Sequence, residues 1–402
     1  MARNAAEERE LAWNAAVEAW ADGNLASAFH FCQAALARGQ DNADMHALLA
    51  SIAIGLGQYD RAQIHLRDAA RRTPRQAEGG KTRYIVIQPW GCGFWGEVDH
   101  VLSQLAIAEI TGRMPIVHWG VGGAYGVPGY DNAWNAYFQP LSNARLGELQ
   151  GADLSIAPSY WTRENLHRTS VEIGRPLEQR ISSLYFLAAG EDVVVADCYT
   201  RLMDVIPWAP SGHWLAQCSA EEAYRGLCES YLRLVPALGR EVDRLADAMF
   251  CERPVLAVHF RTQTASKNNE AAEDRPLAIE DYFPAIDALL HTLGGGRIFL
   301  LTDFNPCVRR MQDRYGPRLL SLPATRLDSA GEVEVRLKLG VDLHAAAREV
   351  IIDAYLAARC DAFLGDGASG VSCAIGHLKR WESGRFALMR ANVALHPGRI
   401  QL

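Results

Sequence analysis

An apolar run, Val255–Val258, is followed at once by two side chains that suit phosphate binding, His259 and Arg261. The run is typical of a buried strand, and side chains two residues apart at a strand end point to the same face of a sheet. Because arginine is always charged and binds phosphate through two parallel hydrogen bonds, the pair indicates a nucleotide or sugar-phosphate site. The alternative is a surface loop with ordinary charges, and the polar stretch up to Glu270 fits either interpretation.

Two further apolar runs end in polar residues. RIFLLTD ends in Thr302 and Asp303, and DAFLGD leads into the glycine turn GDGASG at 365–370. The turn opens into an expected helix, whose first N–H groups attract phosphate. Ligands of open parallel sheets bind beyond the carboxyl ends of the strands. The sequence therefore predicts one binding crevice at these strand ends, lined in part by the turn residues Asp366, Gly367, Ala368 and Ser369.

A second glycine turn, PWGCGFWGE at 89–97, follows the β-branched run RYIVIQP. After it, apolar residues recur at the spacing of a helix with one buried stripe, and MPIVHW follows as another strand. Strand, turn, helix and strand form a βαβ unit, which builds parallel sheets. We expect this turn to face the same ligand from a first α/β domain, through Gly91, Cys92, Gly93 and Phe94.

The remaining pattern predicts which elements carry these clusters. Residues 135–215 are rich in Trp, Tyr and Pro and indicate loops and short elements, and a helical stretch at 219–250 is broken at Pro236. A second alternation then begins, with strands expected at 254–259, 297–303, 318–322 and 361–366 and helices at 279–293, 305–315, 343–358 and 369–382. The fold class is therefore α/β, with two Rossmann-like domains facing a cleft, at 79–248 and 249–402.

The first 78 residues have a different character, because they repeat. WADGNLASAFHFCQAALARG and IGLGQYDRAQIHLRDAARRTP align at a spacing of 34 residues, so that Gly23 matches Gly57 and small residues recur where two helices approach closely. This segment resembles a pair of tetratricopeptide repeats at about 8–76, an all-α domain within 1–78. Since two repeats are fewer than a free-standing solenoid needs, we expect them to dock on the rest of the chain, on a protein partner or on a second subunit.

Composition excludes several classes of function. The chain has 402 residues, 49% hydrophobic residues and a formal net charge of −7. That charge argues against a nucleic-acid partner, and no apolar stretch is long enough to span a bilayer or typical of a signal peptide. Nine cysteines without a CxxC pair are typical of reduced, buried thiols. We expect a cytoplasmic protein with no bound metal and no cofactor.

In order and content, the motifs resemble the α-1,6-fucosyltransferase family with the related nodulation and protein O-fucosyltransferases. The similar segments are GCGFWGEVDHVLSQLAIAEITGRMPIV, VHFRT…NNEAAEDRPLAIEDYF, IFLLTD and VIIDAYLAARCDAFLGDGASGVS, spread over about 300 residues. The resemblance implies an inverting, metal-independent glycosyltransferase of the GT-B type that uses GDP-fucose. It also implies that 79–248 is the acceptor side and 249–402 the donor side, the acceptor being a glycan, a peptide or a protein.

The resemblance assigns roles to individual residues. His259 and Asp353 would hold the base and ribose side of the nucleotide, Arg261 the β-phosphate, and Ser369 with its neighbours the diphosphate. Glu270 falls at the candidate catalytic base, and Thr302 and Asp303 belong to the same donor site.

Departures from the family pattern leave alternatives open. The family's second arginine is Thr262 in this chain, one residue is inserted before Glu-Ala-Ala, and the phosphate turn carries Asp366 and Gly370 in place of uncharged and amide residues. A transferase for another nucleotide sugar fits these differences, and so does a non-catalytic scaffold in which the repeats recruit a partner.

Overall fold

The computed structural model describes residues 5–56, 58, 61–62, 64–65, 68, 81–120, 125–127, 130, 132–150, 153–261, 277–324, 326–328 and 342–392. Contacts group the chain into two compact units. Unit 1 consists of Met1–Cys92, Gly96–Ala136 and Pro140–Leu227, and unit 2 consists of Gly93–Trp95, Tyr137–Gln139 and Cys228–Leu402.

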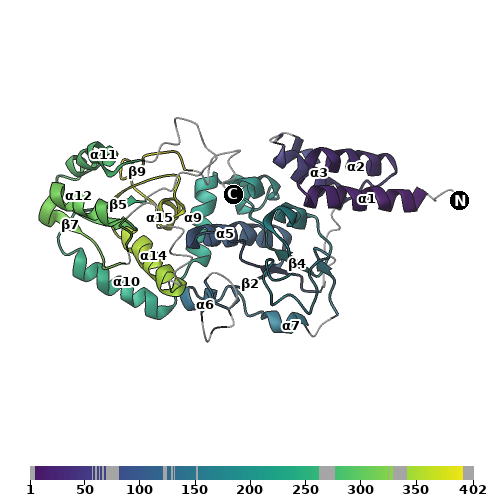
Figure 1. The fold of residues 1–402 in the computed structure, drawn as a ribbon, viewed down its shortest axis with the longest axis horizontal. Coiled ribbons are helices and arrows are strands. Elements are labelled where there is room, and N and C mark those ends of the chain that lie inside the picture. The colour runs from purple at the N-terminus through teal and green to yellow at the C-terminus, as the bar shows by residue number, and fades with distance from the viewer. Residues whose placement is uncertain are drawn as a thin grey trace. The chain divides into compact units, whose positions relative to one another are not determined.

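Unit 1 begins with three helices that lie side by side in Figure 1: α1 (Ala5–Ala21), α2 (Leu25–Ala37) and α3 (Ala43–Gly55). Gly23 makes the turn between α1 and α2 at φ 73°, a conformation that glycine adopts without strain. Asn24 caps α2 by accepting the N–H of Ser27. The fully buried alanines 16, 28 and 35 allow the helices to approach closely, as the repeat pattern predicted.

Helix α3 is buried on all sides from Met45 to Ala53. Met45 and Leu49 belong to the core that α3 forms with α1 and α2, and α3 also contacts η2 (Ser183–Leu187) of the same unit. Because a pair of repeats cannot cover its own outer face, the contact with η2 completes the core of the helical segment.

The α/β part of unit 1 contains a parallel sheet in the order β2-β1-β4-β3 among the described residues. Strand β4 is fully buried at the centre of this sheet, within the region where the sequence indicated loops and short elements. Its signal is three consecutive valines between two aspartates, Asp192 and Asp197. The strands are β1 (Tyr84–Ile87), β2 (Met114–Val117), β3 (Ile156–Ala157) and β4 (Val193–Ala196).

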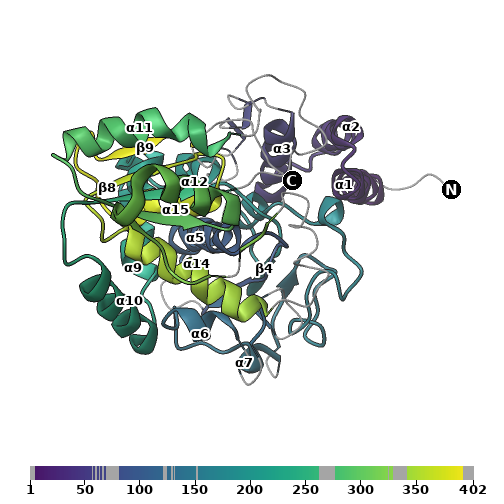
Figure 2. The ribbon, with the colours of Figure 1, turned by 60° about the vertical axis from the view of Figure 1, so that its left-hand side comes forward.

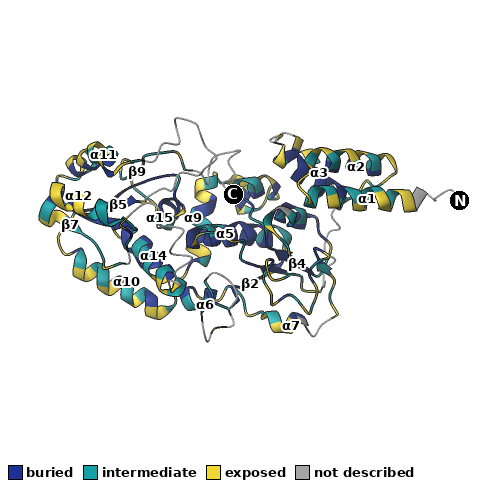
Figure 3. Ribbon diagram, in the orientation of Figure 1, coloured by how far each residue is buried: buried dark blue, intermediate teal, exposed yellow. Residues whose placement is uncertain are grey.

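Helix α5 (Phe94–Thr111) connects β1 to β2 and is buried over most of its length, as its dark blue colour in Figure 3 shows. Short elements fill the rest of unit 1, in agreement with the irregular sequence there. These are α6 (Trp134–Tyr137), α7 (Leu146–Gln150), η1 (Leu177–Gln179), η2, α8 (Leu202–Val205), η3 (Ile206–Trp208), η4 (Trp214–Gln217) and α9 (Ala220–Tyr231), of which α6 and α9 each end in unit 2.

Unit 2 contains a second parallel sheet, in the order β7-β6-β5-β8-β9 among the described residues. Its central strand β5 is buried at every residue. The sequence predicted four of these strands, β5, β6, β7 and β8, and missed β9. The strands are β5 (Val255–Phe260), β6 (Arg297–Thr302), β7 (Leu319–Leu320), β8 (Ala362–Gly365) and β9 (Phe386–Leu388).

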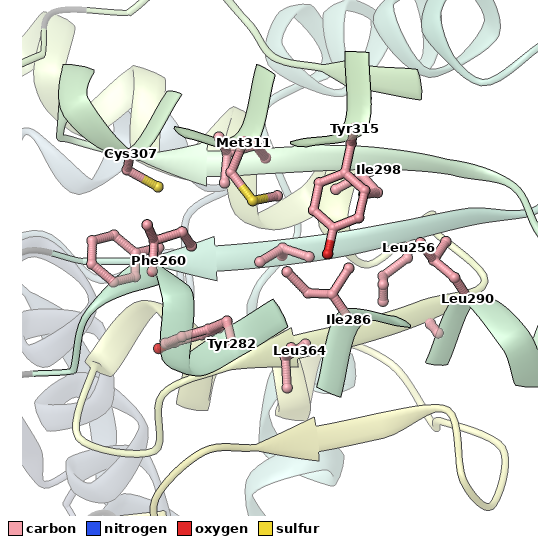
Figure 4. Packing of buried hydrophobic residues seen from close by; sticks show 14 residues of the cluster. Leu256, Phe260, Tyr282, Ile286, Leu290, Ile298, Cys307, Met311, Tyr315 and Leu364 are labelled. Carbon is pink, nitrogen blue, oxygen red and sulfur yellow. The ribbon is translucent and has the colours of Figure 1, made fainter. Parts of the chain in front are cut away.

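Helices cover both faces of this sheet, and Figure 2 shows α11 and α14 on opposite sides of it. Alternate residues of β5, such as Leu256 and Phe260, pack with α11 and α12 in the apolar cluster of Figure 4. The intervening residue His259 faces α15, where it bonds to Ser372. The helices are α10 (Pro236–Met249), α11 (Ile279–Thr292), α12 (Asn305–Tyr315), η6 (Gly316–Arg318), α14 (Leu343–Ala357) and α15 (Gly370–Leu378).

The division between the units lies at Cys228, earlier than the expected boundary at 248/249. Helix α10 is joined to α14 by the ion pair of Glu241 with Arg348. Asp243 of α10 also pairs with Arg359, which lies just after α14, at 2.7 Å. The hydroxyl of Tyr355 in α14 also donates to the Leu232 carbonyl at 2.8 Å. Because its partners are in α14, α10 belongs to unit 2.

Candidate functional site

The order of strands in unit 2 reverses at β5. Strands β6 and β7 follow on one side of it, and β8 and β9 lie on the other side. In sheets of this type, ligands bind beyond the carboxyl ends of the strands at the reversal. The residues that follow there are Arg261 after β5 and Asp366 after β8, so two of the clusters picked out from the sequence meet at this edge.

His259 is held beneath this edge as a neutral imidazole. It is 6% exposed, and its Nδ1 lies 2.7 Å from Ser372 Oγ. Burial and the positive charge of Arg261 lower the pKa of His259 to about 3, although the charge of Asp366 acts in the opposite direction. Ser372 Oγ also accepts the N–H of Asp366 at 3.0 Å, so one hydroxyl joins β5 to the turn after β8. If that hydroxyl donates to Nδ1, the ring proton is on Nε2 and is available to a ligand.

Arg261 is exposed directly after β5, and its positive charge lowers the pKa of His259. A guanidinium in this position can hold a phosphate oxygen with two hydrogen bonds. Glu270, the candidate base, lies outside the described residues, as does Thr262.

The turn after β8 has the form of an anion site. Ser369 is the residue before α15, it is 5% exposed, and its Oγ has no hydrogen-bond partner among the described residues. A buried hydroxyl is costly unless it is bonded, so Ser369 is well suited to donate to a ligand oxygen. The α15 N-terminus adds a favourable field for negative charge.

Asp366, in the same turn, is paired with a cation. Its Oδ1 accepts Arg390 Nε at 2.9 Å, and its Oδ2 accepts Arg390 Nη2. Oδ1 also accepts the Ala368 N–H at 3.1 Å within the turn. The acid that departs from the family pattern is therefore neutralised by a residue from beyond β9.

Thr302 and Asp303 end β6, the third predicted cluster. Arg326 binds there, because its Nε donates to the Thr302 carbonyl at 3.2 Å and its Nη2 donates to the Leu322 carbonyl at 2.7 Å. Asp353 of α14 interacts with the charge of Arg326. Burial is the main cause that raises the pKa of Asp353 to about 7. The positive charge of Arg326 acts to lower this pKa, and the negative charge of Glu349 acts to raise it. The Asp353 carboxyl therefore changes charge near neutral pH.

The glycine turn of unit 1 holds a carboxylate of the chain itself. Glu97, which is buried, accepts the N–H groups of Gly91 at 2.7 Å, Cys92 at 2.8 Å and Trp90 at 3.0 Å. Burial raises the pKa of Glu97, and these three hydrogen bonds act against that shift. Two of the amides expected to face a phosphate are therefore engaged by Glu97.

Phe94, the last residue expected at that turn, is 5% exposed and lies edge-on to Tyr137. Its ring is part of the packing of the protein. Contact of a ligand with Gly91, Cys92, Gly93 and Phe94 stays a prediction, which the positions of Glu97 and of the Phe94 ring make less favourable.

Several residues of the site escaped the sequence reasoning. Ser372 had a local signal, because it lies three residues after Ser369 and hence on the same side of α15. Arg326, Arg390 and Glu97 had no such signal in the sequence. Arg326 and Arg390 bind to strand ends that are distant along the chain. Glu97 acts by accepting hydrogen bonds from backbone amides.

The comparisons with known proteins agree with this architecture. A family model for the tetratricopeptide repeat matches residues 19–81, which confirms the predicted repeats. No curated protein matches the chain. The fucosyltransferase NodZ from Bradyrhizobium has a similar structure, with a TM-score of 0.50 and 20% sequence identity, covering 74% of this chain and 93% of that chain.

Two further solved structures are similar. NodZ α-1,6-fucosyltransferase co-crystallised with GDP has a TM-score of 0.50 and 19% identity, covering 74% of this chain and 93% of its own. POFUT1 in complex with GDP has a TM-score of 0.47 and 14% identity, and the match covers 77% of this chain and 98% of POFUT1. The chain therefore has the α/β fold of the NodZ fucosyltransferase, preceded by tetratricopeptide repeats.

Proposed function

We propose that the protein is an inverting glycosyltransferase that transfers fucose from GDP-fucose to a hydroxyl of a glycan, peptide or protein. The observation that carries the proposal is the meeting of His259, Arg261 and the Ser369 turn at the reversal point of the unit 2 sheet. The fold of NodZ, which was crystallised with GDP, supports the choice of nucleotide.

The leaving group of this reaction is a nucleoside diphosphate, whose negative charge grows as the bond from the sugar C1 to the phosphate oxygen breaks. Arg261, the Ser369 hydroxyl and the α15 N-terminus are the groups that stabilise this charge. His259 remains neutral at physiological pH, since its pKa is lowered to about 3, so it acts as a hydrogen-bonding group and leaves the positive charge to Arg261.

The acceptor hydroxyl attacks C1 from the face opposite the diphosphate, and the configuration at C1 is inverted. The proton of the acceptor hydroxyl must pass to a base, and we assign that role to Glu270 from the family resemblance. His259 and Asp353 would hold the base and ribose side of the nucleotide, and Thr302 would belong to the same donor site.

A thermal-shift and calorimetric panel of GDP, UDP and ADP tests the nucleotide. The expected result is a shift with GDP that exceeds the shifts with UDP and ADP, and turnover of GDP-fucose with a mixture of glycan and peptide acceptors. A preference for UDP or ADP would show that the donor is not GDP-fucose, but it would leave the proposal of a glycosyltransferase unchanged. No shift with any nucleotide would favour the non-catalytic scaffold.

Metal independence is a separate part of the proposal, motivated by the lack of a DxD pair near a strand end in the sequence. Transfer measured in EDTA should equal transfer measured without it. Loss of activity that Mg²⁺ or Mn²⁺ restores would overturn this part alone.

A further inference from the structure

The turn that we assign to the diphosphate is held from behind by the segment that follows β9. The Met389 N–H donates to the Gly365 carbonyl at 2.9 Å. A Cβ at Gly367 would lie 2.3 Å from the carbonyl oxygens of both Arg390 and Ala391. The two pieces of backbone therefore touch, and the conformation of the turn depends on the residues at 389–391.

A charge pair lies within this contact. Arg390 binds Asp366 through two hydrogen bonds, and the side chains are 18% and 5% exposed. Asp366 also bonds to the Ala368 N–H inside the turn. Removing one partner of a buried pair leaves the other as an uncompensated charge, so either substitution changes the local charge by one unit.

The charge of Asp366 reaches the site itself. It acts on the pKa of His259, the residue linked to the turn through Ser372, and both Asp366 and Arg390 act on the pKa of Tyr282. A diphosphate on the turn would be subject to the same field, which is weakly screened in the interior.

We propose that Arg390 is a positioning residue for the donor diphosphate, which cancels the charge of Asp366 and fixes the turn that presents Ser369. The inference rests on the proposed function, because that function assigns the turn to the diphosphate. It explains how an acid is compatible with a phosphate turn in this chain.

Two substitutions that break the same pair separate charge from structure. Arg390→Gln leaves the negative charge of Asp366 behind the phosphates, whereas Asp366→Asn leaves the positive charge of Arg390. For a role in positioning and charge, the Kd for GDP should rise by about tenfold or more in Arg390→Gln and stay the same or fall in Asp366→Asn. A purely structural pair would give weaker binding in both variants.

The experiment is calorimetric titration of the full chain with GDP and, separately, with guanosine, which has no phosphate. The loss in Arg390→Gln should appear with GDP and be small with guanosine, and KM for the donor should rise more than kcat falls. Arg359→Gln is the matched control, because it removes the same charge from an exposed pair with Asp243 near the amino end of β8, and it should bind GDP like the parent.

Melting temperatures of all variants establish folding. If Arg390→Gln does not fold, Arg390→Lys replaces it, and its GDP affinity should lie within about threefold of the parent because the positive charge that offsets Asp366 is kept. Equal weakening in Arg390→Gln and Asp366→Asn, equal losses for GDP and guanosine, or a tenfold loss in Arg390→Lys would overturn the inference. A parent protein that binds no nucleoside diphosphate would overturn the proposed function, and the inference with it.

Discussion

Arg261 is an exposed cation directly after β5, and its charge acts on the buried His259. In the proposed function its charge would face a leaving group whose charge grows in the transition state, so Arg261→Ala should lower transfer by about 10²-fold or more. The melting temperature should hardly change, since the side chain is exposed. Steady-state kinetics check the expectation, with Arg261→Lys restoring only part of the rate because the bidentate contact is lost. Activity of the alanine variant within threefold of the parent would remove Arg261 from the mechanism.

Asp353 should make nucleotide binding depend on pH. Its pKa is raised to about 7, so the carboxyl is mostly neutral at pH 6 and mostly ionised at pH 8. If the ionised form accepts hydrogen bonds from the nucleotide, GDP affinity should rise across this range, by up to about tenfold per pH unit below the pKa. Titrations at several pH values measure this, and Asp353→Asn should flatten the profile. A profile that is the same in both proteins would assign the pH dependence to another group.

The same shift has the opposite sign for stability. The carboxyl of Asp353 holds its proton more tightly in the folded chain than in the unfolded chain, so ionisation opposes folding. Its contribution to the free energy of unfolding should therefore fall as pH rises from about 4 to 7, the range between the ordinary pKa and the raised value.

At the scale of elements, the strands and helices of unit 2 were largely predictable, because buried parallel strands are short apolar runs and the helices between them have a clear period. The clusters at the ends of β5, β6 and β8 followed from the same rule. The residues that bind to these clusters from elsewhere in the chain could not be predicted. For example, the pairing of Asp366 with Arg390 depends on β8 and β9 lying side by side. Strand β4 was missed because irregular residues surround it.

The turn after β8 tolerates only glycine at its second position. A Cβ at Gly367 would lie 2.3 Å from two carbonyl oxygens, so Gly367→Ala must displace either the turn or the segment at 390–391. We expect a loss of about 1–3 kcal/mol in the free energy of unfolding, together with weaker GDP binding.

Gly147→Ala in α7 is the control for that substitution, because no atom lies within 4 Å of its added methyl group. Alanine suits a helix better than glycine, so this variant should be as stable as the parent or slightly more stable. Denaturant unfolding of both variants decides the comparison, and similar stability of the two would show that the turn is free to move.

At the scale of the whole molecule, the helical repeats belong to unit 1, whereas the candidate nucleotide residues at the ends of β5, β6 and β8 belong to unit 2. A chain beginning at Lys81 loses the helix α3 that covers η2, and unit 1 should become less stable and more prone to aggregate. GDP binding by unit 2 should remain similar. Sedimentation and calorimetry of the truncated chain measure the two effects separately. A soluble truncated chain with full transfer activity would leave the repeats without a role in stability or acceptor recruitment.

The strand order of unit 2 also determines the order in which its strands can pair while the chain is being synthesised. Strand β5 can pair with β6 soon after both leave the ribosome, but its other edge waits for β8, since Leu256 pairs with Ala362. Until then one side of the central strand is an open edge that another nascent chain can join. The turn after β8 forms only when that edge closes, so a chain that stops before Ala362 keeps an unpaired strand edge and lacks the turn that we propose binds the diphosphate.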